Sequence, residues 1–170
     1  SCHKAFPEAL AILAGDAMSI HAFSVLANST ALSDAQKVRL IAELAEESGH
    51  HGMIAGQVLD MEQEGRADVT VDQLKTMCAF KTGALIRVAC RMGCIAANAT
   101  DEQIKAADTY GSYLGLAFQI VDDILDVTST TDMLGKPVGS DAEENKVTFV
   151  ILLGLEAAQK EAAALTEKAM

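Results

Sequence analysis

The chain has 170 residues, of which half are hydrophobic, 4% are aromatic and only two are proline, a composition typical of a single helical domain with a sizeable core. Its formal net charge of −11 argues against nucleic acid or an anionic membrane surface as a partner, because both attract basic patches. No apolar run approaches the roughly 20 residues that cross a bilayer, so we expect no membrane insertion, and the four cysteines, which form no C-x-x-C pair, indicate buried, reduced thiols in a cytoplasmic protein.

Apolar residues recur at helical spacing in five segments, and no segment shows the alternation of a strand. The predicted helices cover residues 7–28, 33–61, 70–97, 100–127 and 147–168. Thr70 with Gln73 and Thr100 with Gln103 predict capping boxes at two of the helix starts. Residues 129–144 form the one long irregular segment. The fold class is therefore predicted to be all-α, a helical bundle in one domain over residues 1–170.

An apolar run in the fourth predicted helix abruptly gains polar side chains. They fall within an arc of roughly 100° of the helix and belong to Gln119, Asp122, Asp123 and Asp126. Asp122 and Asp126 are one turn apart, so their like charges weaken the helix unless something outside it neutralises them. Mg²⁺ prefers oxygen ligands and is usually held by one or two carboxylates plus phosphate oxygens. A solvated acidic face is the alternative interpretation, and the apolar residues before the cluster favour the metal.

Two polar positions on otherwise apolar or glycine-rich helix faces are further candidates. Lys81 is surrounded by apolar residues of its own helix, so its ammonium group either reaches out to solvent or meets a buried anion. Gln57 and Asp60 lie one turn apart beside Gly52 and Gly56, which permit close approach of a ligand or of another backbone. Alternatively, these glycines serve helix packing and the polar pair faces water.

The segment after the aspartates contains Lys136 and Lys146. A lysine-bearing loop beside a metal cluster can close over a diphosphate, because its cations compensate charge while the loop excludes water. Glu47-x-x-His50 has the E-x-x-H spacing of di-iron bundles, but that site needs a second such motif, and the sequence contains none. We therefore expect His50 and its neighbour His51 to be partly exposed helix residues.

Several motifs together resemble those of one family. The stretch Phe118-Gln-Ile-Val-Asp-Asp-Ile-Leu-Asp126 resembles the second aspartate-rich motif, F-Q-x-x-D-D-x-x-D, of the trans-prenyltransferases, the farnesyl and geranyl diphosphate synthase family. Lys81-Thr82 matches a K-T pair of that family, and Gly52 to Asp60 matches its G-x-x-x-G-Q-x-x-D segment. Ala11 to Asp16 reads A-I-L-A-G-D, as the family does. The resemblance covers about residues 1–160.

The resemblance implies a bundle of long antiparallel helices, like that of isoprenoid synthases. It also implies head-to-tail condensation of isopentenyl diphosphate with an allylic diphosphate, with Mg²⁺ as the cofactor and a homodimer as the assembly. Asp122, Asp123 and Asp126 would then hold Mg²⁺ on one side of the cleft.

The resemblance also assigns roles in substrate binding and catalysis. Lys81 would hold the allylic diphosphate, while its carbonyl, Thr82 and Gln119 would face the developing carbocation. Gln57 would lie near the diphosphate, and Lys136 would contact it. Lys146 would do the same, although Glu144-Asn-Lys-Val-Thr148 departs from the Gly-Lys-x-Thr that is usual in bacterial members.

The first aspartate-rich motif of the family has no counterpart here, since residues 1–121 contain no D-D-x-x-D. The chain begins without methionine and ends inside an alanine-rich helical pattern, so both ends look cut. We therefore expect a fragment that is inactive alone and whose parent is a short-chain prenyltransferase. A non-catalytic, prenyltransferase-like regulatory subunit is the alternative. A terpene cyclase would lack the Lys81-Thr82 pair and the F-Q-x-x-D-D-x-x-D form.

Overall fold

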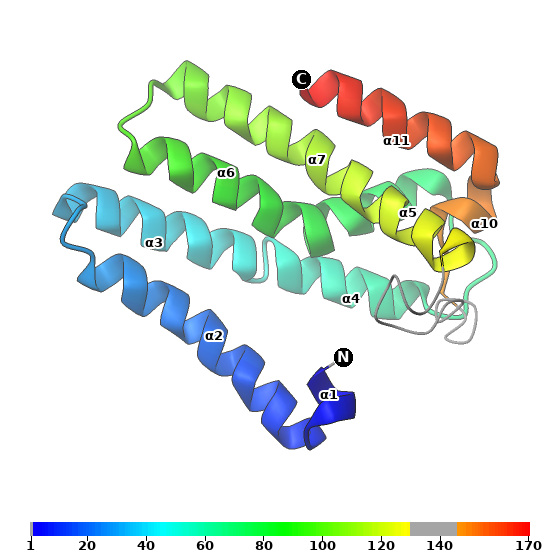
Figure 1. The fold of residues 1–170 in the computed structure, drawn as a ribbon, viewed down its shortest axis with the longest axis horizontal. Helices are drawn as coiled ribbons and strands as arrows, with labels where there is room; N and C mark the ends of the chain where they lie inside the picture. Colours follow the sequence, from blue (N-terminus) through cyan, green and yellow to red (C-terminus); the bar gives the residue numbers. More distant parts are fainter. Residues whose placement is uncertain (1, 130–145) are drawn as a thin grey trace.

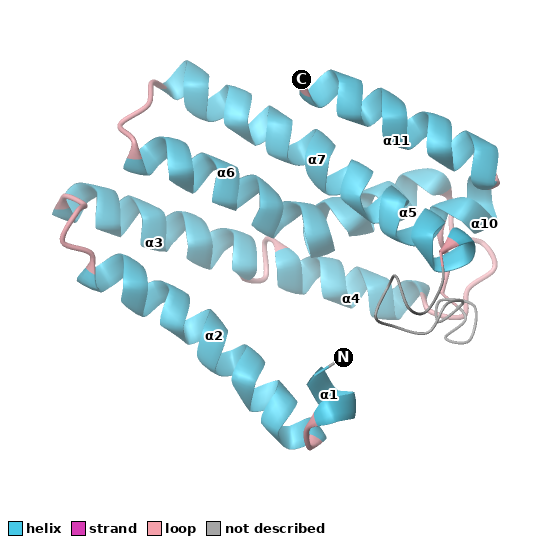
Figure 2. Ribbon diagram, in the orientation of Figure 1, coloured by secondary structure: helices cyan, strands magenta, loops and turns pink. Residues whose placement is uncertain are grey.

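The computed structural model describes residues 2–129 and 146–170, and every regular element in these ranges is a helix (Figure 2). The elements are α1 (Cys2–Ala5), α2 (Glu8–Asn28), α3 (Asp34–Ser48), α4 (Met53–Gln63), α5 (Val71–Cys78), the π-helical turn η1 (Ala79–Gly83), α6 (Ala84–Ala96), α7 (Asp101–Thr128), α10 (Phe149–Leu153) and α11 (Leu155–Ala169). The prediction of an all-α bundle is confirmed. Helix α7 packs against α6 on one side and against α11 on the other (Figure 1).

Local sequence signals explain where the central helices begin. Thr70 and Thr100 each accept a hydrogen bond from the backbone N–H three residues on, and the glutamine at that position bonds back to the threonine N–H. Both predicted capping boxes are thus confirmed, and Ser33 with Gln36 forms a third at the start of α3. Such caps satisfy backbone donors that have no partner within the helix.

Glycines divide two of the predicted helices, and here the sequence-based boundaries were wrong. The helix expected over residues 33–61 is interrupted between Ser48 and Met53. A β carbon at Gly52 would lie 2.0 Å from the carbonyl oxygen of Glu47, so only glycine fits this turn. The helix expected over residues 147–168 breaks at Gly154, which has a φ of 82°, a left-handed value that side chains disfavour.

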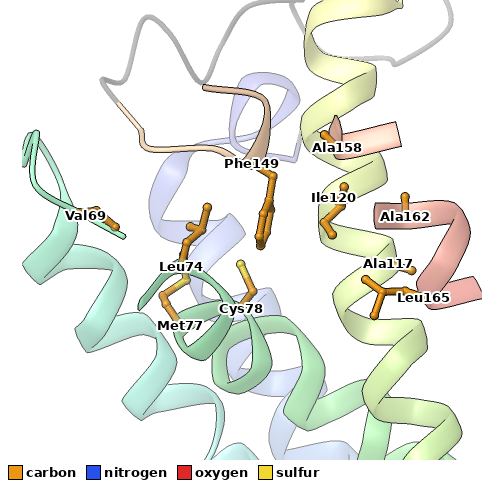
Figure 3. Close-up of a cluster of buried hydrophobic side chains, with 10 residues drawn as sticks. All are labelled: Val69, Leu74, Met77, Cys78, Ala117, Ile120, Phe149, Ala158, Ala162 and Leu165. Atoms are coloured by element: carbon orange, nitrogen blue, oxygen red, sulfur yellow. The ribbon is translucent and has the colours of Figure 1, made fainter. Parts of the chain in front are cut away.

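The main hydrophobic core lies between α5, α7, α10 and α11 (Figure 3). Phe149 and Ile120 are fully buried at its centre, and the Cys78 thiol lies close to them. A second cluster of Leu40, Ile95 and Ile104 joins α3, α6 and α7 at the other end. The two clusters fix both ends of α7, so the polar residues between them are held by packing on each side.

Helix α2 stands apart from this core. It diverges from α3 toward its N-terminal end (Figure 1), and none of its residues is buried. Large apolar side chains are exposed along it, with Met18 at 75% and Ile20 at 70%. By length and composition alone, α2 is the one helix among the described residues that could cross a membrane, with a hydropathy of 1.6 in its most apolar window. Core helices of soluble proteins and signal sequences pass the same test, so the prediction of no membrane insertion stays a prediction.

Candidate active site

The π-helical turn η1 is the element around which the candidate site is built. The helix predicted over residues 70–97 runs continuously through α5, η1 and α6, and η1 contains Lys81 and Thr82. A β carbon at Gly56 of α4 would lie 2.1 Å from the Lys81 nitrogen. A β carbon at Gly115 of α7 would lie 2.8 Å from the Gly83 α carbon. The backbones of α4 and α7 therefore lie directly against η1. Short π-helical turns within α-helices frequently occur at functional sites.

Lys81 forms an ion pair across to α4. Its Nζ donates a hydrogen bond to Oδ2 of Asp60 at 2.5 Å. The two side chains keep 33% and 23% of their surface exposed, so the pair is partly desolvated but open to a ligand. Lys81 thus pairs with a carboxylate, but Asp60 is partly exposed and is not the buried anion that one sequence interpretation expected.

Thr82 and Gln119 are also brought together, as the resemblance implied. The Thr82 hydroxyl donates to Oε1 of Gln119 at 3.0 Å, and Nε2 of Gln119 donates to Oδ1 of Asp123 at 3.0 Å. Oδ2 of Asp123 then accepts from the backbone N–H of Phe149 at 2.8 Å. A continuous line of hydrogen bonds therefore runs from η1 through α7 to the first residue of α10.

The three aspartates near the C-terminal end of α7, Asp122, Asp123 and Asp126, have different surroundings. Asp126 and Asp123 are buried, with 1% and 5% exposure, whereas Asp122 is half-buried. All lie in the last two turns of α7, whose last turn contains no basic residue. The partial negative charge of a helix C-terminus adds to that of the carboxylates, so this end of α7 favours a cation.

A complete metal cage is not formed by the described residues alone. Within residues 2–129 and 146–170, no three His, Cys, Asp or Glu side chains are grouped closely enough to hold a metal ion. The oxygen donors of Asp122 and Asp126 are of the type that Mg²⁺ prefers, and Mg²⁺ commonly takes only one or two carboxylates from a protein. The residues present therefore fit a magnesium site that other groups complete, and the assignment of Asp122, Asp123 and Asp126 stays a prediction.

The remaining predicted substrate-binding residues differ in position. Lys146 lines a cavity of about 180 Å³ together with Asp60, Gln63, Glu64, Met77 and Val147. Because Asp60 is also the partner of Lys81, both lysines belong to the same region of the molecule. Gln57 is exposed on α4, one turn before Asp60. Lys136 lies outside the described residues.

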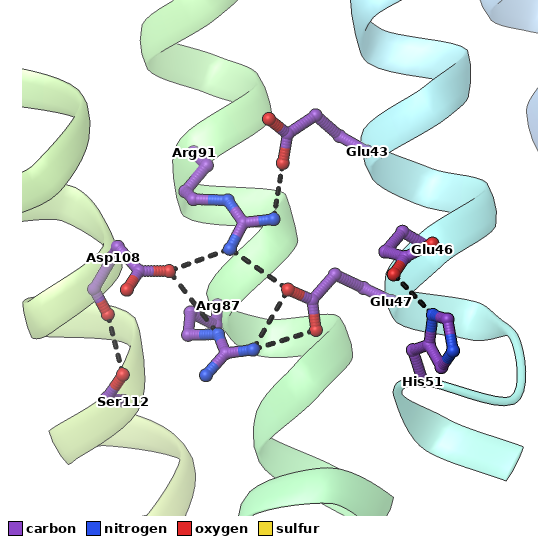
Figure 4. A network of polar contacts seen from close by, with 8 residues as sticks. All are labelled: Glu43, Glu46, Glu47, His51, Arg87, Arg91, Asp108 and Ser112. Atoms are coloured by element: carbon purple, nitrogen blue, oxygen red, sulfur yellow. Dashed lines mark hydrogen bonds and ion pairs between the residues drawn. The ribbon is translucent and has the colours of Figure 1, made fainter. Parts of the chain in front are cut away.

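A network of charged side chains links α3, α6 and α7, and the sequence analysis missed it (Figure 4). Glu47, 6% exposed, accepts two bonds from Arg87 at 2.9 Å each and one from Arg91 at 3.0 Å. Arg91 also bonds to Asp108 at 2.9 Å and to Glu43. The spacings Glu43-x-x-x-Glu47 and Arg87-x-x-x-Arg91 are the signal that could have found the network.

The network affects the pKa of Arg91, and it occupies the Glu47 carboxylate of the E-x-x-H pattern with arginines. Burial lowers the pKa of Arg91, but the hydrogen bonds that Arg91 donates to Asp108 and Glu43 outweigh burial and raise the pKa overall. The carboxylate of Glu47 binds arginines, and Nδ1 of the exposed His51 lies 2.6 Å from Oε1 of Glu46. His50 and His51 are exposed, as the sequence interpretation expected, but they lie in the turn between α3 and α4 and not within a helix, because the chain turns at Gly52.

The cysteines are free thiols, but the expectation that they are buried holds for Cys78 alone, since Cys2 is exposed and Cys90 and Cys94 are half-buried. Burial raises the pKa of Cys78 to about 12, and the nearby Asp123 carboxylate adds to the effect. Cys78 therefore stays protonated and inert at neutral pH and serves the core between α5 and α10.

Comparison with known proteins places these features in a family. The polyprenyl synthetase family model matches residues 1–170. The farnesyl diphosphate synthase of Escherichia coli is 45% identical over 172 residues, covering 99% of this chain and 57% of that protein. A chloroplastic geranylgeranyl pyrophosphate synthase of Catharanthus roseus is 42% identical, covering 98% of this chain and 47% of that protein. The chain thus spans about half the length of the curated relatives it matches.

Solved structures show the same relationship in three dimensions. A geranyltransferase of Helicobacter pylori, crystallised with magnesium and isoprenyl diphosphate, superposes with a TM-score of 0.89 at 36% identity. The match covers 99% of this chain and 55% of that one. A geranyltransferase of Legionella pneumophila superposes with a TM-score of 0.81, also at 36% identity, and covers all of this chain and 55% of that one.

Proposed function

Because the chain belongs to the polyprenyl synthetase family, we propose that the protein it represents is a short-chain trans-prenyltransferase. It condenses isopentenyl diphosphate head-to-tail with an allylic diphosphate in isoprenoid biosynthesis. The allylic C–O bond breaks to give a carbocation and diphosphate, and the double bond of isopentenyl diphosphate attacks the cation. Loss of a proton to the departing diphosphate completes the new prenyl diphosphate.

The observation that carries this proposal is the meeting of Lys81, Thr82 and Gln119 at η1. Lys81 provides a cation for the diphosphate. The ion pair with Asp60 holds its ammonium group in a partly exposed position, where a ligand can reach it. Next to Lys81, the hydroxyl of Thr82 on η1 and the amide oxygen of Gln119 on α7 provide dipoles. Preorganised dipoles of this kind stabilise charge that develops in a transition state.

Asp122 and Asp126 would hold Mg²⁺, which neutralises the leaving diphosphate when bound. The partial negative charge at the end of α7 supports this role for its carboxylates. Gln57, Lys136 and Lys146 are the further residues proposed to bind the diphosphate. Asp123, also in the predicted metal set, accepts hydrogen bonds from Gln119 and from the backbone N–H of Phe149.

We also propose that the protein is a cytoplasmic homodimer and that residues 1–170 belong to one helical domain. The unburied apolar side chains of α2, such as Met18 and Ile20, support a covered surface in the assembled protein. We expect Met18→Glu with Ile20→Glu to shift the complete protein from dimer toward monomer in sedimentation velocity. The exposed change Lys160→Glu on α11 is the control, and a dimer that survives the α2 changes would contradict this assignment.

The function is tested by incubating the complete protein with radiolabelled isopentenyl diphosphate and an allylic diphosphate, with and without Mg²⁺. We expect a prenyl diphosphate that forms only when metal is present. Its chain length would distinguish farnesyl from geranylgeranyl products, because relatives of both kinds match the chain. We expect the 170-residue chain alone to be inactive, since it contains one D-D-x-x-D motif of the two that the family uses. Turnover by that chain alone would refute the second expectation.

A further inference from the structure

Asp122, Asp123 and Asp126, near the C-terminal end of α7, do not share one task. We propose that Asp123 is a positioning residue that orients the amide of Gln119 toward η1, while metal binding is left to Asp122 and Asp126. This inference rests on the proposed function for its consequence in catalysis. Its basis is the set of hydrogen bonds that Asp123 makes inside the protein.

One carboxylate oxygen of Asp123 determines which way the Gln119 amide points. An ionised carboxylate only accepts hydrogen bonds, so the group of Gln119 that faces Oδ1 must be the Nε2 donor, at 3.0 Å. The amide oxygen Oε1 then necessarily faces the opposite way. There it accepts the Thr82 hydroxyl at 3.0 Å.

The other carboxylate oxygen of Asp123 is tied to the core. Oδ2 accepts from the backbone N–H of Phe149 at 2.8 Å, and Phe149 is fully buried. A buried backbone N–H without an acceptor destabilises a protein, because its hydrogen bond to water is lost and not replaced. Asp123 therefore joins α7 to α10 through one of its two carboxylate oxygens.

The consequence for catalysis is electrostatic. With Gln119 fixed by Asp123, the negative end of the amide dipole points at η1, where the proposed function places the developing carbocation. Dipoles that are aligned before the reaction need no reorganisation when charge develops. A reversed amide would direct its positive end to the same place. Asp123 thus acts through Gln119 and need not touch the substrate.

The substitution Asp123→Asn tests this role because it changes one acceptor oxygen into a donor. The Phe149 N–H still requires an acceptor, so the new NH₂ group faces Gln119 and turns the Gln119 amide over. We expect kcat of the complete protein to fall about tenfold to a hundredfold, as is usual when a supporting hydrogen bond is lost. In a Gln119→Leu background we expect Asp123→Asn to cause no further loss, since the two residues act as one unit.

A metal titration separates this role from that of a ligand. Calorimetry of Mg²⁺ binding to the complete protein with inorganic pyrophosphate compares Asp123→Asn with the matched variant Asp122→Asn. We expect Asp122→Asn to weaken Mg²⁺ binding about tenfold and Asp123→Asn to change it less than about twofold. Equal weakening in both variants, or an additive loss of kcat in the Gln119→Leu background, would overturn the proposal.

Separate controls test whether the variants fold and whether the wild-type protein transfers prenyl groups. Circular dichroism establishes that each variant is folded. If Asp123→Asn is not, Asp123→Ser replaces it, because serine removes the carboxylate and leaves room for a water molecule that can accept from the Phe149 N–H. If the wild-type protein transfers no prenyl group, the proposed function fails. The contrast between Asp122→Asn and Asp123→Asn in Mg²⁺ affinity still decides whether Asp123 is a ligand.

Discussion

One polar network joins α6 to α7 and another joins η1 to α7. The two networks differ in how many of their side chains are charged. Near the middle of the bundle, Arg87 and Arg91 meet three carboxylates, so every member carries a full charge. At η1 the line from Thr82 through Gln119 to the Phe149 N–H contains a single charged group, Asp123. Opposite charges attract in many geometries, whereas neutral groups bond only when donor faces acceptor. The first network holds the helices together, and the second fixes the direction of individual dipoles.

The largest effect expected from this contrast is on stability, in the charged network. Glu47→Gln leaves Arg87 and Arg91 without their shared buried carboxylate. We expect the free energy of unfolding to fall by about 3 kcal/mol, the lower end for a broken buried ion pair because Arg87 keeps 29% exposure. Urea denaturation followed by circular dichroism measures the loss.

The matched control for Glu47 is an exposed glutamate. Glu156→Gln removes the partner of Lys160, and these side chains are 83% and 75% exposed. The cost should stay below about 0.5 kcal/mol. Equal effects of Glu47→Gln and Glu156→Gln would mean that the charged network does not hold the bundle together.

A smaller effect is expected where α7 presses on η1. Gly115→Ala places a methyl group 2.8 Å from the α carbon of Gly83, and backbone atoms cannot move aside as a side chain can. We expect a loss of about 1–3 kcal/mol in stability, with a fall in kcat because Thr82 moves relative to Gln119. The measurements are urea denaturation and steady-state kinetics on the complete protein.

Gly93→Ala is the control for that change. No heavy atom lies within 4 Å of a β carbon at Gly93, so the substitution should raise helix stability by about 0.5–1 kcal/mol. If Gly115→Ala behaved like Gly93→Ala, the position of η1 would not depend on the close backbone contact.

Local rules predicted much of the fold from the sequence. Apolar spacing located α2, α7 and the continuous run from α5 to α6. The pair Thr70 with Gln73 marked the start of α5, and the pair Thr100 with Gln103 marked the start of α7. The breaks at Gly52 and Gly154 were missed, because a glycine within an apolar pattern is compatible with a continuous helix. Only the backbone angles and close contacts reveal that the chain turns there.

The candidate site was predicted in part. The spacing within α7 placed Gln119, Asp122, Asp123 and Asp126 in one arc, and motif resemblance added Lys81 and Thr82. It did not reveal that Asp123 faces α10, because that depends on where Phe149 lies, 26 residues further along the chain. Nor did it pair Lys81 with Asp60, although both had been singled out. Contacts between distant segments follow from tertiary packing, which local patterns do not encode.

The central claim is that the aspartate end of α7 supports metal-dependent prenyl transfer. The most direct test is turnover of isopentenyl diphosphate with an allylic diphosphate by the complete protein and its Asp122→Ala variant, over a range of Mg²⁺ concentrations. We predict metal-dependent product from the wild type and a loss of about a hundredfold or more in the variant, in line with the removal of a transition-state charge contact. Unchanged turnover in Asp122→Ala, or no product from a well-folded wild type with any allylic substrate, would contradict the account.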